Sequence, residues 1–298
     1  MTKVLFFLLT LFIFVPSNNN NIFQWEKEVT PHFILHYSPS ASPWVKNLLG
    51  QIENYRKRVQ EFFGISVEDK VHIFLVGSYG DLSQIKCIVY DKFPLWASGL
   101  AIPQKKIIIL TTPSLSKGES FSLVNTFIHE YTHLVIEIFL QGKSIPRWLN
   151  EGMAMYVSGQ KDFYNTLLLS KAFVFSSLIP FEQLKNSFPV TSSEIRLAYA
   201  QSFNMVSYLM DHFGRERFYK FLKFIRSGIP FKKAFFFGFG ENFSSVENSW
   251  KKSLKRKLLW LPAITSSLTL WFFLSLLVII AYFKRLRRKK RWEGEDDL

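Results

Sequence analysis

The sequence predicts an α+β fold in which a small sheet precedes a group of helices. Short apolar segments bounded by turn residues occupy the first 110 residues, where we expect the strands. Beyond residue 120 the apolar residues recur at helical spacing. Because 48% of the 298 residues are hydrophobic, the chain can bury a sizeable core, as one large domain or two ordinary ones.

The expected strands are four short segments in the N-terminal part of the chain. They combine apolar and β-branched residues: 32–37, 71–76, 99–102 and 106–110. A turn containing Pro103 separates the last two strands, which we therefore expect to be neighbours. Between the first two strands, residues 44–63 carry apolar side chains at helical spacing, which predicts an amphipathic helix.

The rest of the chain is expected to be mostly helical. The segments with helical spacing are 120–140, 150–157, 197–213, 215–227 and 244–257. The phenylalanine-rich run 231–239 has irregular spacing. We expect this run to pack against the last of these helices rather than to form a binding site.

Residues 1–17 have the layout of a secretory signal. One lysine, Lys3, precedes an apolar run at 4–15 that ends at Pro16. No small-x-small cleavage site follows, so a removed signal peptide and an uncleaved N-terminal anchor both stay open. The asparagines at 18–21 are expected to form a linker.

Residues 258–283 form a run of 26 residues without a charge. This is longer than the ~20 residues that cross a bilayer core as a helix, so we predict a transmembrane helix there. The tail at 284–298, first basic and then acidic, is predicted to be cytoplasmic. Residues 22–257 would then form one domain outside the cytoplasm, in a single-pass protein, or a two-pass protein if the signal is uncleaved.

The formal net charge of +14 has a simple explanation in this topology. Many of the cations lie beside the apolar C-terminal run, at 251–257 and 284–291. Membrane topology accounts for them more simply than a surface for nucleic acid or anionic lipid, so no nucleic-acid partner is expected. Cys87 is the only cysteine, which excludes an intrachain disulfide and a zinc site rich in thiolates.

The strongest functional signal is a His-Glu-x-x-His motif at 129–133, inside the helix expected at 120–140. His129 and His133 are four residues apart, so their imidazoles project from one face of the helix and both can bind one metal ion. Glu130 lies on an adjacent part of that face. Its carboxylate can accept a proton from a water whose pKa the metal lowers toward ~7.

Catalytic zinc takes three protein ligands and keeps one position open, so a third ligand is expected. Glu151 follows His133 by eighteen residues, and Pro146 separates the two helices, which lets Glu151 reach the ion from a second direction. Glu137 is the rival carboxylate. It lies four residues beyond His133 on the same helix, too far along the axis to complete a tetrahedron. The sequence therefore predicts a Zn²⁺ site made by His129, His133 and Glu151.

Two segments carry a resemblance to a known group: the motif at 129–133 and the run Trp-Leu-Asn-Glu-Gly at 148–152. Together they resemble the gluzincins, zinc metallopeptidases of the peptidase MA-like families related to the M1 aminopeptidases. The segment 198–202, Ala-Tyr-Ala-Gln-Ser, is similar to a third one often found in peptidase MA-like domains. The resemblance covers about residues 30–255. It implies a thermolysin-like gluzincin fold, with a sheet-bearing N-terminal lobe, a mostly helical C-terminal lobe and a zinc cleft between them.

The sequence departs from the M1 pattern at two places. Seventeen residues separate His133 from Glu151, against the usual eighteen, a change that a loop can absorb. M1 enzymes also carry Gly-x-Met-Glu-Asn on the strand before the metal helix, and its Glu binds the free amine of the substrate. The comparable positions 99–103 read Gly-Leu-Ala-Ile-Pro here, without an acid. We therefore expect an endopeptidase rather than an aminopeptidase.

The resemblance also implies a tyrosine in the C-terminal lobe that donates a hydrogen bond to the oxyanion, and Tyr199 is the candidate. The alternative is an aromatic side chain packed in the core. With catalytic Glu130 and Tyr199, the sequence predicts a membrane-anchored zinc metallopeptidase that hydrolyses peptide or protein substrates outside the cytoplasm. The sheet edge formed by 99–102 and 106–110 is expected to bind the extended peptide. The alternative function is a catalytically silent peptidase-like module that binds a partner at the membrane surface.

Overall fold

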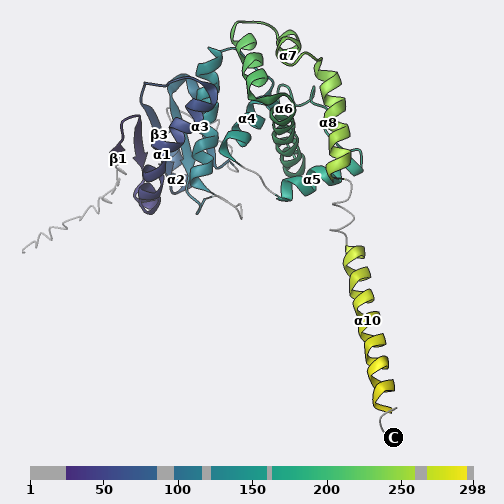
Figure 1. Ribbon diagram of the computed structural model, residues 1–298. Helices are drawn as coiled ribbons and strands as arrows, with labels where there is room; N and C mark the ends of the chain where they lie inside the picture. Colours follow the sequence, from purple (N-terminus) through teal and green to yellow (C-terminus); the bar gives the residue numbers. More distant parts are fainter. Residues whose placement is uncertain (1–24, 86–96, 116–121, 160–162, 259–266, 294–298) are drawn as a thin grey trace, which may run out of the picture.

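The computed structural model describes residues 25–85, 97–115, 122–159, 163–258 and 267–293. Within them the chain forms a sheet-bearing lobe, a helical lobe beside it and a separate C-terminal helix (Figure 1). The predicted α+β fold, with a small N-terminal sheet and a mostly helical remainder, is confirmed. The signal segment predicted at 1–17 and the cysteine Cys87 lie outside the described residues.

The sheet has five strands: β1 Glu26–Val29, β2 Phe33–Tyr37, β3 Val71–Val76, β4 Gly99–Ile102 and β5 Ile107–Thr111. Their order in the sheet is β1-β2-β3-β5-β4. β2, β3 and β5 are parallel, while β1 and β4 pair antiparallel at the two edges. The four predicted strands and the pairing of the last two are confirmed. β1 escapes prediction because all four of its residues are exposed, so no apolar alternation marks it.

α1 (Ser42–Phe63) links β2 to its parallel neighbour β3 as a crossover helix. Its apolar residues recur at helical spacing and bury one face: Val45, Leu48, Ile52, Val59 and Phe63. α1 and α3 (Leu123–Leu140) pack in one core with the inward face of the sheet. α2 (Tyr79–Gln84) and two short 3-10 turns, Pro39–Ala41 and Pro103–Lys105, complete this lobe.

α3 lies between the sheet and the helical lobe and carries the metal motif. Ser122 caps its start, because the hydroxyl accepts a hydrogen bond from the backbone N–H of Asn125 at 3.3 Å. On the sheet side, Phe127 and Tyr131 contact Phe33 of β2 at ring-centroid distances of 5.4 and 5.6 Å. Thirteen of its eighteen residues are buried. The motif therefore lies on a helix whose surface is mostly buried.

The helical lobe consists of α4 Arg147–Ser158, α5 Phe163–Val174, α6 Ser192–Arg226, α7 Phe231–Phe239 and α8 Phe243–Leu258. α6 spans both helices predicted at 197–213 and 215–227, with a kink at Gly214, whose φ of 80° and ψ of 163° are not helical. α4 packs tightly on α6 at Gly152, where a Cβ would lie 2.4 Å from the backbone oxygen of Ser202. This contact fixes the position of α4 relative to α6.

The phenylalanine-rich run 231–239 forms α7, and its predicted packing role is confirmed with one correction. Its main partner is α6, where Phe221 contacts Phe235 and Phe239 at ring-centroid distances of 5.5 and 5.1 Å. The predicted partner, α8, is contacted as well, through Phe235 and Phe243 at 5.3 Å. The part of α6 after Gly214 offers α7 an apolar face made of four buried residues: Phe218, Phe221, Leu222 and Ile225.

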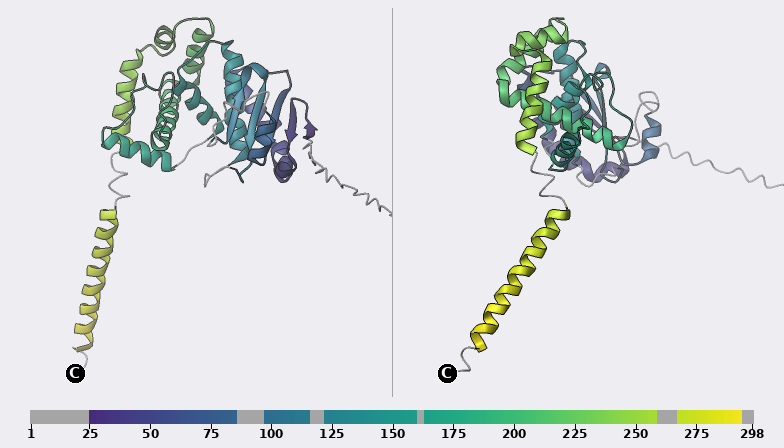
Figure 2. Two further views of the ribbon diagram at one scale, coloured as in Figure 1. Left: turned by 180° about the vertical axis from the view of Figure 1, so that it is seen from behind. Right: turned by 90° about the vertical axis from the view of Figure 1, so that its right-hand side faces the viewer.

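α10 (Ser267–Glu293) extends away from the two lobes (Figures 1 and 2). In the part of the chain that the structure describes, no helix is both long enough and apolar enough to span a membrane. Part of the predicted transmembrane segment, residues 259–266, lies outside the described residues. The prediction of a span at 258–283 is therefore not confirmed.

Candidate metal centre

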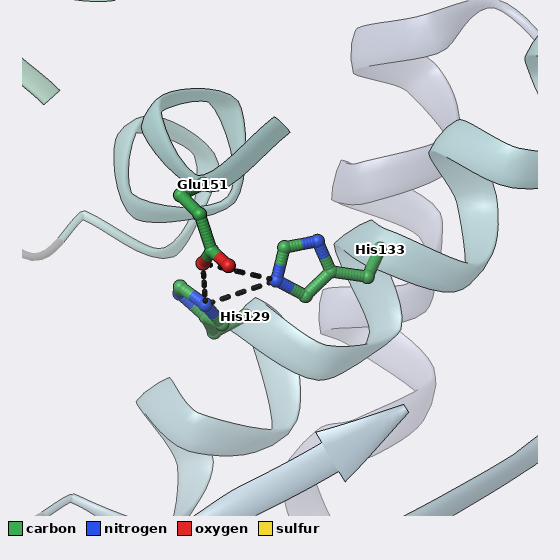
Figure 3. Close-up of side chains that lie close together, drawn as sticks. All are labelled: His129, His133 and Glu151. Atoms are coloured by element: carbon green, nitrogen blue, oxygen red, sulfur yellow. Dashed lines mark hydrogen bonds and ion pairs between the residues drawn. The ribbon is translucent and has the colours of Figure 1, made fainter. Parts of the chain in front are cut away.

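Three side chains converge where α3 meets α4 (Figure 3). His129 and His133 project from one face of α3, and Glu151 projects toward them from α4. The two Nε2 atoms are 3.1 Å apart, and Glu151 Oε2 lies 3.4 Å from His129 Nε2 and 3.5 Å from His133 Nε2. The structure thus brings together the three residues that the sequence predicted as metal ligands.

These separations fit a zinc ion. Ligands about 2.1 Å from zinc at tetrahedral angles lie roughly 3.4 Å from one another, close to the measured separations. Two imidazoles and one carboxylate are also a donor set that catalytic zinc sites use, with the fourth position left for water. No other group of three or more His, Cys, Asp or Glu side chains with ligand spacing occurs among the described residues.

Asn150 orients the ring of His133. Its Oδ1 lies 2.9 Å from His133 Nδ1, and since a carbonyl oxygen only accepts, Nδ1 carries the proton and Nε2 keeps its lone pair for a metal. α4 therefore supplies both a ligand, Glu151, and the group that orients another ligand. His129 Nδ1 is buried and has no hydrogen-bond partner within the described residues.

The buried carboxylate of Glu151 is held as an anion. Burial alone would raise its pKa, but hydrogen bonds and charge from His129 and His133 hold the pKa far below its usual range. In the metal-free site His133 shows the reciprocal effect: burial would lower its pKa, and the hydrogen bond and charge of Glu151 raise it to about 9. A metal ion at Nε2 would displace that proton. Arg147, one helical turn before Glu151, adds a further cation, with Nε 3.5 Å from Glu151 Oε1.

Glu130 lines the cleft beside the ligands and packs against the edge strand β4. Burial raises its pKa above the ordinary value, although the charges of His129 and His133 and a hydrogen bond from the Ala101 N–H act in the opposite direction. A raised pKa suits a group that takes up and returns a proton near neutral pH. Gly99 allows the close packing, because a Cβ there would lie 2.7 Å from Glu130 Cγ.

A cleft of ≈ 560 Å³ opens over these residues. One wall is β4, through Gly99, Leu100 and Ala101, and the opposite wall includes α4, Lys185 and Tyr199. β4 is an edge strand of the sheet. The prediction of a sheet edge beside the metal site is therefore confirmed.

Comparison with known proteins identifies the family. The model of the Peptidase MA superfamily matches residues 54–256, more than half of the chain. The chain belongs to the Peptidase MA superfamily. The family expected from the motifs at 129–133 and 148–152 is thereby confirmed. No curated protein shows significant sequence similarity to the chain.

Several solved structures are similar to this Peptidase MA protein. A two-domain M1 zinc metallopeptidase bound to L-tryptophan is 16% identical, with a TM-score of 0.45 over 76% of this chain and 51% of that chain. Leukotriene A4 hydrolase from Saccharomyces cerevisiae is 14% identical, with a TM-score of 0.45 over 76% of this chain and 37% of that chain. An aminopeptidase N family protein from Idiomarina loihiensis is 15% identical, with a TM-score of 0.32 over 80% of this chain and 42% of that chain. The chain thus spans about half the length of these proteins or less.

Tyr199 lies on α6 and lines the same cleft as the metal residues of this Peptidase MA protein. It is half-buried at the cleft wall and is not among the buried residues of the core. Burial, followed by the charge of Glu151, raises its pKa well above the usual range. Its hydroxyl is therefore protonated at neutral pH and can donate a hydrogen bond into the cleft.

Glu137, the rival carboxylate, lines the cleft but does not belong to the metal cluster. Its Oε1 accepts a hydrogen bond from Gln104 Nε2 at 3.5 Å. The other four histidines do not line the cleft: His32, His36, His72 and His212.

Sequence reasoning missed four polar residues of the cleft: Arg147, Asn150, Lys185 and Asn186. Asn150 and Arg147 precede the ligand Glu151 by one residue and by one helical turn, so their position on α4 was an available signal. Lys185 and Asn186 belong to no motif. Only the folded chain brings them beside the metal site.

Proposed function

We propose that the protein is a zinc-dependent metallopeptidase that hydrolyses peptide bonds. The observation that carries this proposal is the convergence of His129, His133 and Glu151 at zinc-ligand separations, with Glu130 beside them in an open cleft. Membership of the Peptidase MA superfamily supports the same reaction class. When bound, zinc would supply Lewis-acid polarisation of the scissile carbonyl and would lower the pKa of the attacking water.

The side chains of the protein would carry out the proton transfers. The Glu130 carboxylate accepts the proton of the attacking water and returns it to the nitrogen of the leaving amine, acting first as base and then as acid. The Tyr199 hydroxyl, protonated at neutral pH, donates a hydrogen bond to the oxygen on which negative charge develops. Asn150 keeps the His133 ring in its ligand orientation throughout.

The specific proposal is an endopeptidase that binds its substrate as an extended strand along β4. β4 pairs with β5 on one side and forms an edge of the sheet, and main-chain hydrogen bonds to such an edge are indifferent to side-chain identity. No acid stands at 99–103 to hold the free amine of a substrate. Besides Glu130 and Glu151, the described cleft wall carries one carboxylate, Glu137, and this residue would have to hold the amine in an aminopeptidase.

One peptide, offered with a free and with an acetylated N-terminus, tests this proposal. We expect the zinc-loaded protein to cut internal bonds of both forms at similar rates and to lose both activities with a chelator. Release of single residues from the free peptide alone, abolished by Glu137→Gln, would overturn the endopeptidase assignment. If zinc-loaded protein shows no chelator-sensitive cleavage of any unfolded protein, the peptidase proposal itself is wrong.

We further propose that this domain is anchored to a membrane with its cleft outside the cytoplasm. The support is the uncharged run at 258–283, its basic flanks and the signal-like segment at 1–17. Protease added to intact spheroplasts should digest residues 22–257 and leave a C-terminal epitope tag after residue 298 protected. A protected central domain with a digested tag would reverse the orientation, and complete protection of both would contradict surface exposure.

A further inference from the structure

The cleft over the metal centre continues into a second hollow of ≈ 430 Å³. Ile145, Lys185 and Asn186 line both hollows, so the two adjoin along the start of α4. The second hollow is also lined by Gly228 and Pro230, which lie in the connection from α6 to α7. A peptide that runs along β4 and past the metal centre can therefore extend into it, which a substrate cut only at its terminus would not need.

Three cations line this groove. Lys143 lines the second hollow, Arg147 lines the cleft, and Lys185 lines both. No acidic residue appears among the described residues that line the second hollow. In the cleft itself, Glu130 and Glu151 belong to the metal centre, and Glu137 accepts a hydrogen bond from Gln104. The lining of the second hollow is thus positively charged.

Two of these cations, Lys143 and Lys185, are exposed and available to a ligand. The side chains of Arg147 and Lys185 are 43% and 51% exposed. Lys185 has a weak partner in the exposed Glu182, with the charged atoms 3.5 Å apart. Arg147 is less available than the lysines, because its Nε lies 3.5 Å from Glu151 Oε1 and its guanidinium lies over the ring of Phe188, 5.1 Å from the centroid.

Backbone hydrogen bonds hold the Lys185 segment in a fixed place relative to the metal ligands. The N–H groups of Arg147 and Trp148 donate to the carbonyl oxygens of Lys185 and Leu184 at 2.7 and 3.1 Å. These donors belong to the first turn of α4, one helical turn before Glu151. The distance from the scissile bond to Lys185 is therefore set by the fold and not by a free loop.

We propose that this groove selects substrates with an acidic side chain on the side of the scissile bond that enters the second hollow. The inference rests on the proposed peptidase function and names its substrate class: peptides carrying Asp or Glu a few residues from the cut. A carboxylate entering the hollow meets Lys185 and Lys143, and Arg147 is nearer the metal. Each partly exposed ion pair of this kind contributes about a two- to five-fold preference, and added salt screens it.

Peptide binding to the zinc-loaded Glu130→Gln protein tests the proposal without requiring turnover. Acetylated fluorescent peptides carry one Asp, moved position by position, and matched peptides carry Asn there. Fluorescence anisotropy should show the Asp peptide binding about two- to five-fold more tightly at positions on one side only, with the difference shrinking in 1 M salt. The variants Lys143→Glu and Lys185→Glu should remove or invert the preference.

Lys57→Glu is the matched control, because Lys57 is exposed on α1 and lines neither hollow. It changes the net charge by the same amount and should leave the preference intact. Equal affinity for Asp and Asn peptides at every position would overturn the proposal, and so would a preference that survives Lys185→Glu and Lys143→Glu together. Tight, charge-selective binding without cleavage by the unmutated protein would uphold the groove and refute the peptidase function. Cleavage without charge-selective binding would uphold the peptidase function and refute the proposed selectivity of the groove.

Discussion

Gly152 offers a sharp test of how the packing of α4 supports the metal centre. It follows the ligand Glu151 and faces α6 so closely that an added Cβ would lie 2.4 Å from Ser202 O and 2.7 Å from a methyl carbon of Val206. Ordinary carbon contacts begin near 3.4 Å, so the Gly152→Ala variant must move α4 away from α6 by about 1 Å. Glu151 moves with it, although its Oε2 must stay within 3.4–3.5 Å of the two histidine nitrogens to share an ion with them.

The magnitudes separate this effect from a change in helix propensity. Replacing Gly by Ala inside a helix alone stabilises by up to ~1 kcal/mol, whereas overpacking a core contact costs about 1–3 kcal/mol. We therefore expect Gly152→Ala to lower the free energy of unfolding by up to ~2 kcal/mol. Because metal–ligand distances tolerate only about ±0.2 Å, zinc affinity should fall on the order of 10- to 100-fold, like the loss of a ligand-orienting partner.

Urea unfolding measures the first quantity, and competition with a fluorescent zinc chelator measures the second. Gly50→Ala on α1 is the matched control, because no atom lies within 4 Å of the added Cβ. It should stabilise the protein slightly and leave zinc affinity unchanged. The reasoning is refuted if Gly152→Ala binds zinc as tightly as the parent, whatever its stability.

Three further predictions concern the base, the edge strand and a buried carboxylate. Glu130→Gln should abolish hydrolysis and keep zinc, because the amide cannot accept the water's proton at neutral pH; turnover by the variant would contradict this role. Gly99→Ala should push β4 off Glu130 and lower kcat while zinc content, measured by atomic absorption, stays that of the parent; an unchanged kcat would contradict the contact. Burial alone would raise the pKa of Asp81, but hydrogen bonds from three serines lower it. The ionised Asp81 therefore stabilises the folded protein above its unfolded pKa of ~3.9, and this stabilisation is lost as the pH falls through the lower folded pKa. Asp81→Asn should therefore destabilise at pH 7, and in urea unfolding its effect should shrink as the pH falls below the unfolded pKa of ~3.9. An effect that is equal at neutral and at acid pH would contradict the pKa shift.

Most of the elements that the sequence predicted have an apolar spacing that reflects a single buried face. α1, β2 and β3 follow this pattern. β4 and β5 do not, and they were predictable from their apolar residues and the Pro103 turn between them. The expected bounds of all five agree with the structure within about two residues. α4 begins three residues before the predicted helix, because Pro146 fits the N-cap position rather than breaking the helix later. α2, only six residues long and held by a capping box, is too short for periodicity to reveal.

The residues of the candidate site also differ in whether the sequence could predict them. His129, Glu130 and His133 could be predicted because helical spacing alone places them on neighbouring faces of α3. Glu151 could be predicted because zinc needs a third ligand. Lys185 could not, because it reaches the cleft through backbone hydrogen bonds to α4, and no sequence pattern encodes that pairing.

Metal analysis of the purified protein tests whether His129, His133 and Glu151 bind zinc. We expect about one zinc per chain, as three ligands with one open position require, in the parent and in Glu137→Ala. His129→Ala and Glu151→Ala should each lose the metal while keeping the helical circular dichroism spectrum of the parent. Zinc retained in folded Glu151→Ala, or lost in folded Glu137→Ala, would contradict the assignment of His129, His133 and Glu151 as the metal ligands.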